Sequence, residues 1–260
     1  MTGATQERMS ESARPGISMR LDIKGDAKRV IATVKAGGVA LIPMDVGYAG
    51  IGGCEAALMR FFKAKGRGAH KRNAMLGNLA LHDELHVLDA RGRDMVRALV
   101  EDHDLPVAVV ANFREQHPLL RALGDAALAA STDGGTLAML LNAGNFLRAV
   151  TEEATAQGQP LFGSSANLTG SGTRFRVEDV QPEIRGVADI VVDYGLQKFH
   201  RYRRSSTMID FRTMEVVRIG SCYEVIGDVL KRHFGVELPP DPGLEALPSG
   251  HLREAQRNYA

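Results

Sequence analysis

Short apolar runs that alternate with amphipathic segments are the feature that most constrains how this chain folds. Residues 39–43 (VALIP) form a continuous apolar run, which is typical of a buried strand. An amphipathic pattern from about Asp26 to Ala36 precedes this run and ends at Gly37-Gly38, which predicts a helix closed by glycine. The first predicted element is therefore a helix that leads directly into a buried strand.

The same alternation continues to about residue 234. Further strands are expected at 106–111, 136–141, 160–162, 189–192 and 207–211, and further helices at 55–64, 92–102, 145–157, 177–185 and 223–234. Strands that alternate with helices predict the α/β class. The chain has 260 residues, 44% of them hydrophobic, which is enough for one large core. We expect a flexible leader at 1–20, one domain at 21–236 and a C-terminal tail at 237–260.

Charge and cysteine content indicate the compartment in which the protein is expected. The formal net charge of +1 argues against a protein whose whole surface is basic and binds nucleic acid. Segments 63–72 and 198–204 are nevertheless basic and contain no acidic residue. Cys54 and Cys222 lie far apart, so neither a zinc site nor a disulfide framework is indicated. No apolar run reaches the roughly 18 residues that a membrane span needs. These features predict a cytoplasmic protein with no membrane partner.

A polar loop after one predicted strand indicates where a ligand binds. Residues 160–162 are predicted to form a short buried strand, and the GSSANLTG sequence at 163–170 then supplies hydroxyl, amide and backbone N–H groups that can hold phosphate. Lys65 and Arg67 stand two residues apart, so in an extended segment both side chains leave the same face. Together these groups suggest nucleotide chemistry without a P-loop.

Each of these residues also has an ordinary structural interpretation. Ser165 and Asn167 are residue types that commonly cap turns, and isolated basic residues such as Lys65 are more often exposed than catalytic. His82 and His86 stand four apart, as in a zinc-binding helix, but the glutamate of that motif is displaced by one position. No metal site is therefore expected.

The order of several short motifs resembles the YrdC/YciO family of threonylcarbamoyl-adenylate synthases. The motifs are Gly-Gly-Val-Ala-Leu-Ile-Pro-x-Asp-x-x-Tyr (37–48), Lys-Gly-Arg-x-x-x-Lys (65–71), Gly-x-Leu (135–137), Pro-Leu-x-x-x-Ser-Ala-Asn-Leu-Thr-Gly (160–170), Ser-Thr-x-Ile-Asp (206–210) and Val-Arg-Ile-Gly (217–220). The resemblance implies a YrdC-like fold, a single twisted mixed α/β sheet with flanking helices and a basic concave face. It also implies that ATP, hydrogencarbonate and L-threonine, with Mg²⁺, give threonylcarbamoyl-AMP and pyrophosphate for tRNA modification.

The same resemblance implies roles for individual residues. The catalytic tetrad of the family corresponds to Lys65, Arg67, Ser165 and Asn167. The residues that would bind ATP are Lys71, Thr136, Ser164, Ser206 and Arg218. Asp45 and Tyr48 would bind the amine substrate, although Tyr48 can equally be a core aromatic residue. Carbamate formed from the amine is an anion, so cations are needed where it approaches the anionic α-phosphate.

Three departures from the family pattern concern the amine pocket and its surroundings. Met44 and Val46 replace the threonines that the family usually has there, and segment 142–145 lacks the usual Arg-x-Pro. Gly68 replaces a common proline. A pocket with fewer hydroxyl groups should select threonine less strongly, so we expect L-threonine to be a poor substrate. The alternative is that Met44 and Val46 point into the core and threonine binds as usual.

Three functions therefore remain open. The first is adenylation of a carbamate formed from hydrogencarbonate and an amine, either threonine or another. The second is formation of a carbamoyl adenylate from carbamoyl phosphate, which would be passed to a downstream carbamoyl-transfer protein. The third is a noncatalytic module that binds double-stranded RNA or tRNA, for which the 5% aromatic content makes base stacking a weak expectation.

Overall fold

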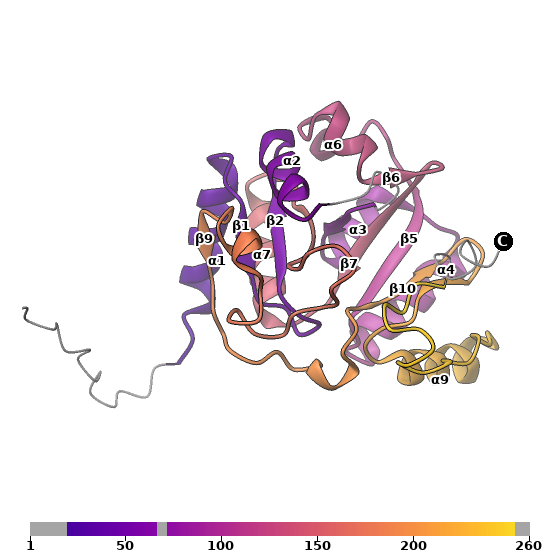
Figure 1. Cartoon of the computed structure of the whole chain (residues 1–260). Helices are drawn as coiled ribbons and strands as arrows, with labels where there is room; N and C mark the ends of the chain where they lie inside the picture. The colour runs from indigo at the N-terminus through magenta and orange to yellow at the C-terminus, as the bar shows by residue number, and fades with distance from the viewer. Residues whose placement is uncertain (1–19, 67–71, 253–260) are drawn as a thin grey trace, which may run out of the picture.

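The computed structural model describes residues 20–66 and 72–252 (Figure 1). Its strands are β1 (Ala40–Ile42), β2 (Ala49–Gly52), β3 (Ala74–Leu76), β4 (His86–Val87), β5 (Val107–Phe113), β6 (Thr132–Asp133), β7 (Thr136–Leu141), β8 (Phe162–Ser165), β9 (Ile190–Val191), β10 (Thr207–Asp210) and β11 (Glu215–Arg218). Its helices are α1 (Ile23–Lys35), α2 (Glu55–Ala64), α3 (Leu79–Leu85), α4 (Ala90–Arg97), α5 (Pro118–Arg121), α6 (Asp125–Ala129), α7 (Asn145–Ala156), α8 (Pro182–Arg185) and α9 (Tyr223–Phe234), with a π turn η1 (Ala98–Asp102) and a 3₁₀ turn η2 (His200–Tyr202).

The strands form one open mixed sheet. Their order is β11-β10-β5-β7-β3-β8-β2-β1-β9, with β4 paired to β5 and β6 paired to β7. Three pairs are parallel (β1 with β9, β10 with β5, and β3 with β7), whereas β5 and β7 are antiparallel. Strands β5 and β7 run obliquely to β1 and β2 in Figure 1, which shows the twist of the sheet. The prediction of a single twisted mixed sheet with flanking helices is confirmed.

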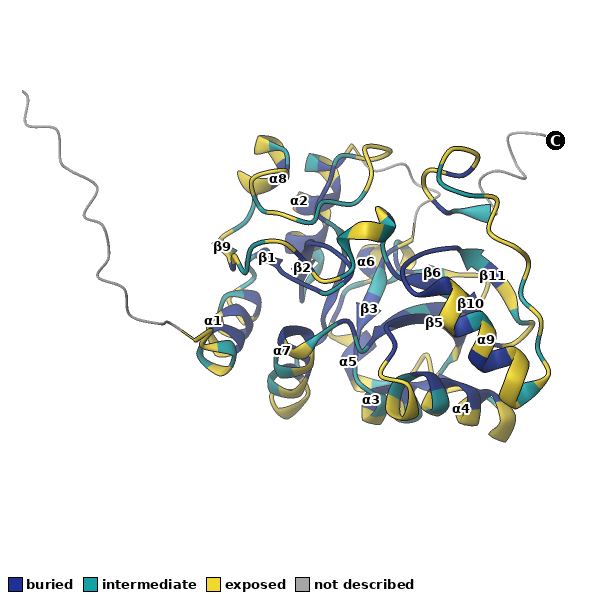
Figure 2. Ribbon diagram, turned by 90° about the horizontal axis from the view of Figure 1, so that it is seen from below, coloured by how far each residue is buried: buried dark blue, intermediate teal, exposed yellow. Residues whose placement is uncertain are grey.

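Alternating side chains divide the core between the two faces of the sheet. In β7, Leu137, Met139 and Leu141 pack in one apolar cluster with residues of α2, α4 and α9, while Leu140 packs in a second cluster with residues of α1 and α7. This is the two-residue period of a strand buried on both faces. Figure 2 shows that the helices turn their buried sides toward the strands and their exposed sides outward. No helix in residues 20–66 and 72–252 is long and apolar enough to cross a membrane.

A glycine in β2 fixes the position of α2. A Cβ atom at Gly50 would lie 2.2 Å from the Phe61 ring, so only glycine lets that ring pack directly on the strand. Phe61 is 1% exposed and sits one turn before the end of α2. The close approach therefore places the C-terminal end of α2 against β2, and with it Lys65.

The predicted elements differ from the structure in instructive places. Of the helix expected at 177–185, only α8 (Pro182–Arg185) forms. Helical geometry is disfavoured for the residue before a proline, so the helix begins at Pro182. The strand expected at 160–162 instead spans Phe162–Ser165, so Ser164 and Ser165 belong to β8 rather than to the following turn. Ser165 pairs there with Ala49 of β2, which the sequence did not predict as a strand.

The packed chain continues beyond Val236, where the sequence suggested that the domain ends. Arg204 is 4% exposed and pairs with Asp241 at 2.7 Å, and its Nη2 atom donates to the carbonyl of Leu247 at 2.6 Å. The N–H of Ile219 donates to the carbonyl of Gly250 at 2.8 Å. Residues 239–252 therefore lie against the β10–β11 hairpin.

The histidines at positions 82 and 86 form a buried pair. Their Nδ1 atoms are 2.9 Å apart, and the residues are 1% and 4% exposed. Two nitrogens at this distance share one N–H, so the accepting ring is neutral. Burial lowers the pKa of His82 to about 4 and that of His86 to about 3.

This pair should make the protein less stable in mild acid. Unfolded histidines gain protons near pH 6.5 while the folded pair does not, so the contribution is complete above that pH and is lost as the pH falls toward 4. The free energy of unfolding should fall by up to about 2.7 kcal/mol per pH unit in this range. Urea denaturation at pH 7.5 and pH 5.0 measures the fall, and a His82→Asn/His86→Leu variant is the control. An equal fall in both proteins would show that the pair is not responsible.

Candidate functional site

Lys65 caps the end of α2 and does not lie in an extended segment. Its backbone is helical, with φ −72° and ψ −12°, and Gly66 then reverses the chain with φ +57°. The sequence-based expectation of an extended segment is therefore wrong at Lys65. Arg67 and Lys71, the other basic residues predicted for the site, lie outside the described residues.

The Lys65 side chain joins α2 to the end of β8. Lys65 is 3% exposed, and its ammonium group donates to the backbone carbonyls of Ser165 and of Asn167, the latter at 2.8 Å. The Lys65 carbonyl in turn accepts the N–H of Thr169 at 3.0 Å. The ammonium also lies 5.4 Å from the centroid of the Phe61 ring, within the range of a cation–π contact. Three of the four predicted tetrad residues thus come together.

Two side-chain oxygens on the residues at and after the end of β8 are buried and have no hydrogen-bond partner among the described residues. They are Oγ of Ser164 and Oδ1 of Asn167. The amide nitrogen of Asn167 donates to the carbonyl of Leu168 at 2.6 Å, which fixes the orientation of the group. An unpaired buried acceptor costs about 1–3 kcal/mol, so these two oxygens require an explanation.

Ser206 and Arg218 form a second group. The Arg218 guanidinium donates from Nε to the Ser206 carbonyl at 2.8 Å and from Nη2 to the Ser206 hydroxyl at 2.9 Å. Strands β3, β7 and β5 separate β8 from β10 in the sheet, so this group belongs to a different part of the sheet from Ser165. Thr136 begins β7, and its hydroxyl donates to the carbonyl of Asp133 at 2.6 Å.

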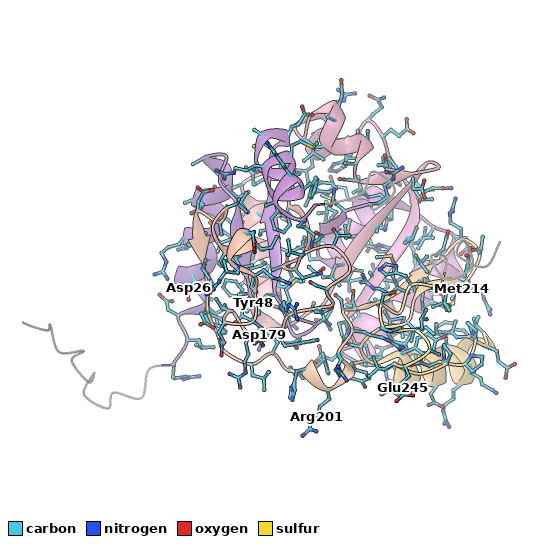
Figure 3. All side chains as sticks on the ribbon, viewed as in Figure 1. Asp26, Tyr48, Asp179, Arg201, Met214 and Glu245 are labelled. Carbon is cyan, nitrogen blue, oxygen red and sulfur yellow. The ribbon has the colours of Figure 1, made fainter. Side chains whose placement is uncertain are left out.

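Tyr48 is fully buried, and its hydroxyl organises the loop at 193–197. The hydroxyl oxygen lies 3.1 Å from Oδ1 of Asp193 and 3.0 Å from the Gly195 carbonyl, and it accepts from Nε2 of Gln197 at 3.2 Å. Burial raises the pKa of this phenol well above its usual value. Figure 3 shows Tyr48 within the body of the molecule, whereas Arg201 projects from its lower surface.

Asp45 lines a cavity of about 400 Å³. The cavity lies between the β1–β2 connection, the start of α7 and the segment 194–198, and neither Lys65 nor Ser165 lines it. Lys198 places its ammonium 3.5 Å from the Asp45 carboxylate across this cavity. A Cβ atom at Gly144 would lie 2.4 Å from Oδ1 of Asp45, which explains why glycine precedes α7.

Met44 and Val46 both pack in the apolar core. Val46 is fully buried, and Met44 is 6% exposed and also lines the cavity. Their burial agrees with the alternative that these side chains point inward, although Met44 still faces the space beside Asp45.

Sequence reasoning missed Gln197 and Arg174 as neighbours of the predicted site. Gln197 reaches the Tyr48 hydroxyl from 149 residues away, and the Arg174 carbonyl accepts the N–H of Tyr48 at 2.8 Å. Neither residue belongs to a motif, so no sequence signal identified them. The basic segment 198–204 was noted, but its charges separate: Lys198 faces Asp45, and Arg204 is buried against Asp241.

Removing the Tyr48 hydroxyl should loosen the 193–197 loop. A Tyr48→Phe variant removes the acceptor of the Tyr194 N–H and one hydrogen bond each of Asp193 and Gln197, so the free energy of unfolding should fall by about 1–3 kcal/mol. Chemical denaturation measures this change. Tyr202→Phe is the control, because its hydroxyl bonds to exposed Glu224 and its loss should cost at most about 0.5 kcal/mol. Equal losses in the two variants would contradict the role assigned to Tyr48.

Comparisons with known proteins identify relatives of this fold. The family model Sua5_yciO_yrdC, described as telomere recombination, matches residues 32–220. A hypothetical protein from Streptococcus mutans, smu.1377c, superposes with a TM-score of 0.69 at 22% identity, over 81% of this chain and 92% of that one. None of the curated protein sequences compared with the chain gave a significant match.

Two larger proteins also contain this fold. Sua5 from P. abyssi, solved with L-threonine, superposes with a TM-score of 0.67 at 18% identity, over 85% of this chain and 61% of that one. HypF in a phosphate- and nucleotide-bound form gives a TM-score of 0.58 at 16% identity, over 77% of this chain and 29% of that one. At these identities the likeness is one of fold, and the chain spans only part of either protein.

Proposed function

Because the chain belongs to the Sua5/YciO/YrdC family, we propose that it is a nucleotidyltransferase that forms a carbamoyl-type adenylate from ATP, hydrogencarbonate and an amine. The observation that carries the proposal is the buried contact of the Lys65 ammonium with the carbonyls of Ser165 and Asn167. It supports a shared site for the two predicted motifs, which are 100 residues apart. The P. abyssi Sua5 structure with L-threonine favours an amino acid as the amine.

The proposed reaction has two steps. The amine and hydrogencarbonate condense to a carbamate with loss of water. A carbamate oxygen then bonds to the α-phosphorus of ATP while the bond from that phosphorus to the β-phosphate oxygen breaks, which releases pyrophosphate. Both partners of the second step are anions, so catalysis depends on cations that offset their repulsion. Lys65 and Arg67 supply these charges in the proposal.

The surroundings of Lys65 suit such a role. Two carbonyl bonds hold the ammonium in place before any substrate arrives, so little reorganisation is needed during the reaction. The unpaired oxygens of Ser164 and Asn167 are acceptors that nucleotide hydroxyl or N–H groups would satisfy in the proposal. In the proposal, Lys71 and Thr136 also bind ATP, and Ser206 with Arg218 contacts the far end of a nucleotide that extends across β3, β7 and β5.

Mg²⁺ accompanies ATP in this proposal. No group of three or more metal-ligating side chains occurs within residues 20–66 and 72–252. Mg²⁺ commonly binds through substrate phosphates and water with few protein ligands, so this arrangement is compatible with delivery on the triphosphate. The ion would neutralise charge on the leaving pyrophosphate.

Pyrophosphate release from ATP tests the reaction. We expect it to require hydrogencarbonate together with an amine, and a panel of amino acids read by mass spectrometry of the adenylates identifies that amine. Val46 is buried in the core, so the expectation that threonine is used more slowly than the best amine rests on Met44, which lines the cavity beside Asp45. Selective use of threonine would instead support the standard tRNA-modifying role. Pyrophosphate release that depends on carbamoyl phosphate would support the second candidate reaction. If no condition releases pyrophosphate, the third candidate, a noncatalytic RNA-binding module, is favoured.

Arg67→Ala should lower turnover by about 100-fold, because the guanidinium offsets charge in the transition state. Arg67→Lys should restore only part of the loss, since a forked donor becomes a point charge. Steady-state pyrophosphate release measures both variants. Arg60→Ala is the control, because Arg60 lies on exposed α2 surface and pairs with Asp189. Near-normal turnover of Arg67→Ala, at unchanged stability, would contradict the assignment.

A further inference from the structure

We propose that Arg174 is a substrate-binding residue that holds an oxyanion of the substrates through its guanidinium group. The inference rests on the proposed function and concerns the same site. The Arg174 carbonyl accepts the N–H of Tyr48 at 2.8 Å, and the Tyr48 carbonyl accepts the N–H of Ala166 at 2.8 Å. One backbone segment therefore separates Arg174 from Ser165 and Asn167, the residues that contact Lys65.

The Arg174 guanidinium has no partner in the described part of the chain. It makes no hydrogen bond or ion pair with any residue in 20–66 or 72–252, and its Nε atom is shielded from solvent. The buried Arg204, by contrast, pairs with Asp241 at 2.7 Å. Arg174 is partly exposed, so solvent ions can reach it, while its buried Nε–H lacks the acceptor that a buried donor normally has.

The backbone around Arg174 is held on both sides. A Cβ atom at Gly47 would lie 2.4 Å from Cγ2 of Thr173 and 3.0 Å from the Arg174 carbonyl oxygen, and Gly47 has φ +112°. On the other side, the carbonyl of Phe175 accepts the N–H of Gln197 at 3.0 Å. The close approach requires glycine at position 47, and it fixes the arginine without using its side chain.

The fork of a guanidinium group matches phosphate and carboxylate. Two oxyanions of the proposed substrates could occupy this position: the nucleotide phosphates proposed to lie near Ser165, and the carboxylate of an amino acid near Tyr48. They share one chemistry, and binding experiments can distinguish them.

The test compares Arg174→Ala with Arg176→Ala, a matched control two residues away. Arg176 is exposed and pairs with Glu178 at 3.4 Å. Calorimetry with Mg²⁺-ATP should show at least a tenfold rise in Kd for Arg174→Ala and no change for Arg176→Ala. If the anion is instead a carboxylate, the Kd for ATP stays constant and the KM for the amino acid rises at least tenfold. Arg174→Lys should recover part of either loss.

Thermal unfolding without substrates separates this role from a structural one. Removing an unpaired cation should leave the Tm unchanged or raise it, whereas removing a structural arginine lowers it. A lower Tm together with unchanged Kd and KM would overturn the inference for Arg174. If such a variant keeps the wild-type rate of pyrophosphate release, the proposed function survives this failure. If the wild-type protein neither binds ATP nor releases pyrophosphate, both proposals fall.

Discussion

The packing of Phe61 on Gly50 is the contact on which the candidate site depends. It brings the end of α2 against β2, the neighbour of β8, and Lys65 then reaches the carbonyls at the end of β8. A larger residue at position 50 would push α2 outward and move Lys65 with it. The position of the Lys65 ammonium therefore depends on Gly50 of β2 having no side chain. The same Phe61–Gly50 contact packs the core and positions the site.

Tyr48 plays a complementary role at the start of β2. Its backbone lies between Ala166 and Arg174, and its hydroxyl holds the loop that carries Gln197. One residue thus fixes the positions of the β8 end, the segment at 173–175 and the loop beside the Asp45 cavity. The resemblance suggested contact with the amine, whereas the hydrogen bonds indicate that Tyr48 arranges the residues around that space.

The sequence predicted the fold best where local pattern and tertiary packing agree. Helix α2 and strand β7 begin and end where the apolar pattern predicts, because their buried faces follow the helix and strand periods. Strand β2 was missed, since its AGIG sequence has little intrinsic strand preference and its glycine serves the contact with Phe61. The motifs predicted that Lys65 would meet Ser165. They carried no information about Arg174, whose position depends on backbone contacts between segments far apart in the chain.

The segment at 239–252 also has a consequence for self-association. Strand β11 ends the sheet, and the bond from Ile219 to Gly250 continues the hydrogen bonding where that strand stops. Unpaired strand edges are templates for pairing with other molecules, and natural proteins often cover them. A chain shortened to end after α9 would lose this cover and the acidic partner of Arg204. The end of β11 would then be an open strand edge, the kind of surface at which a second molecule can add a strand.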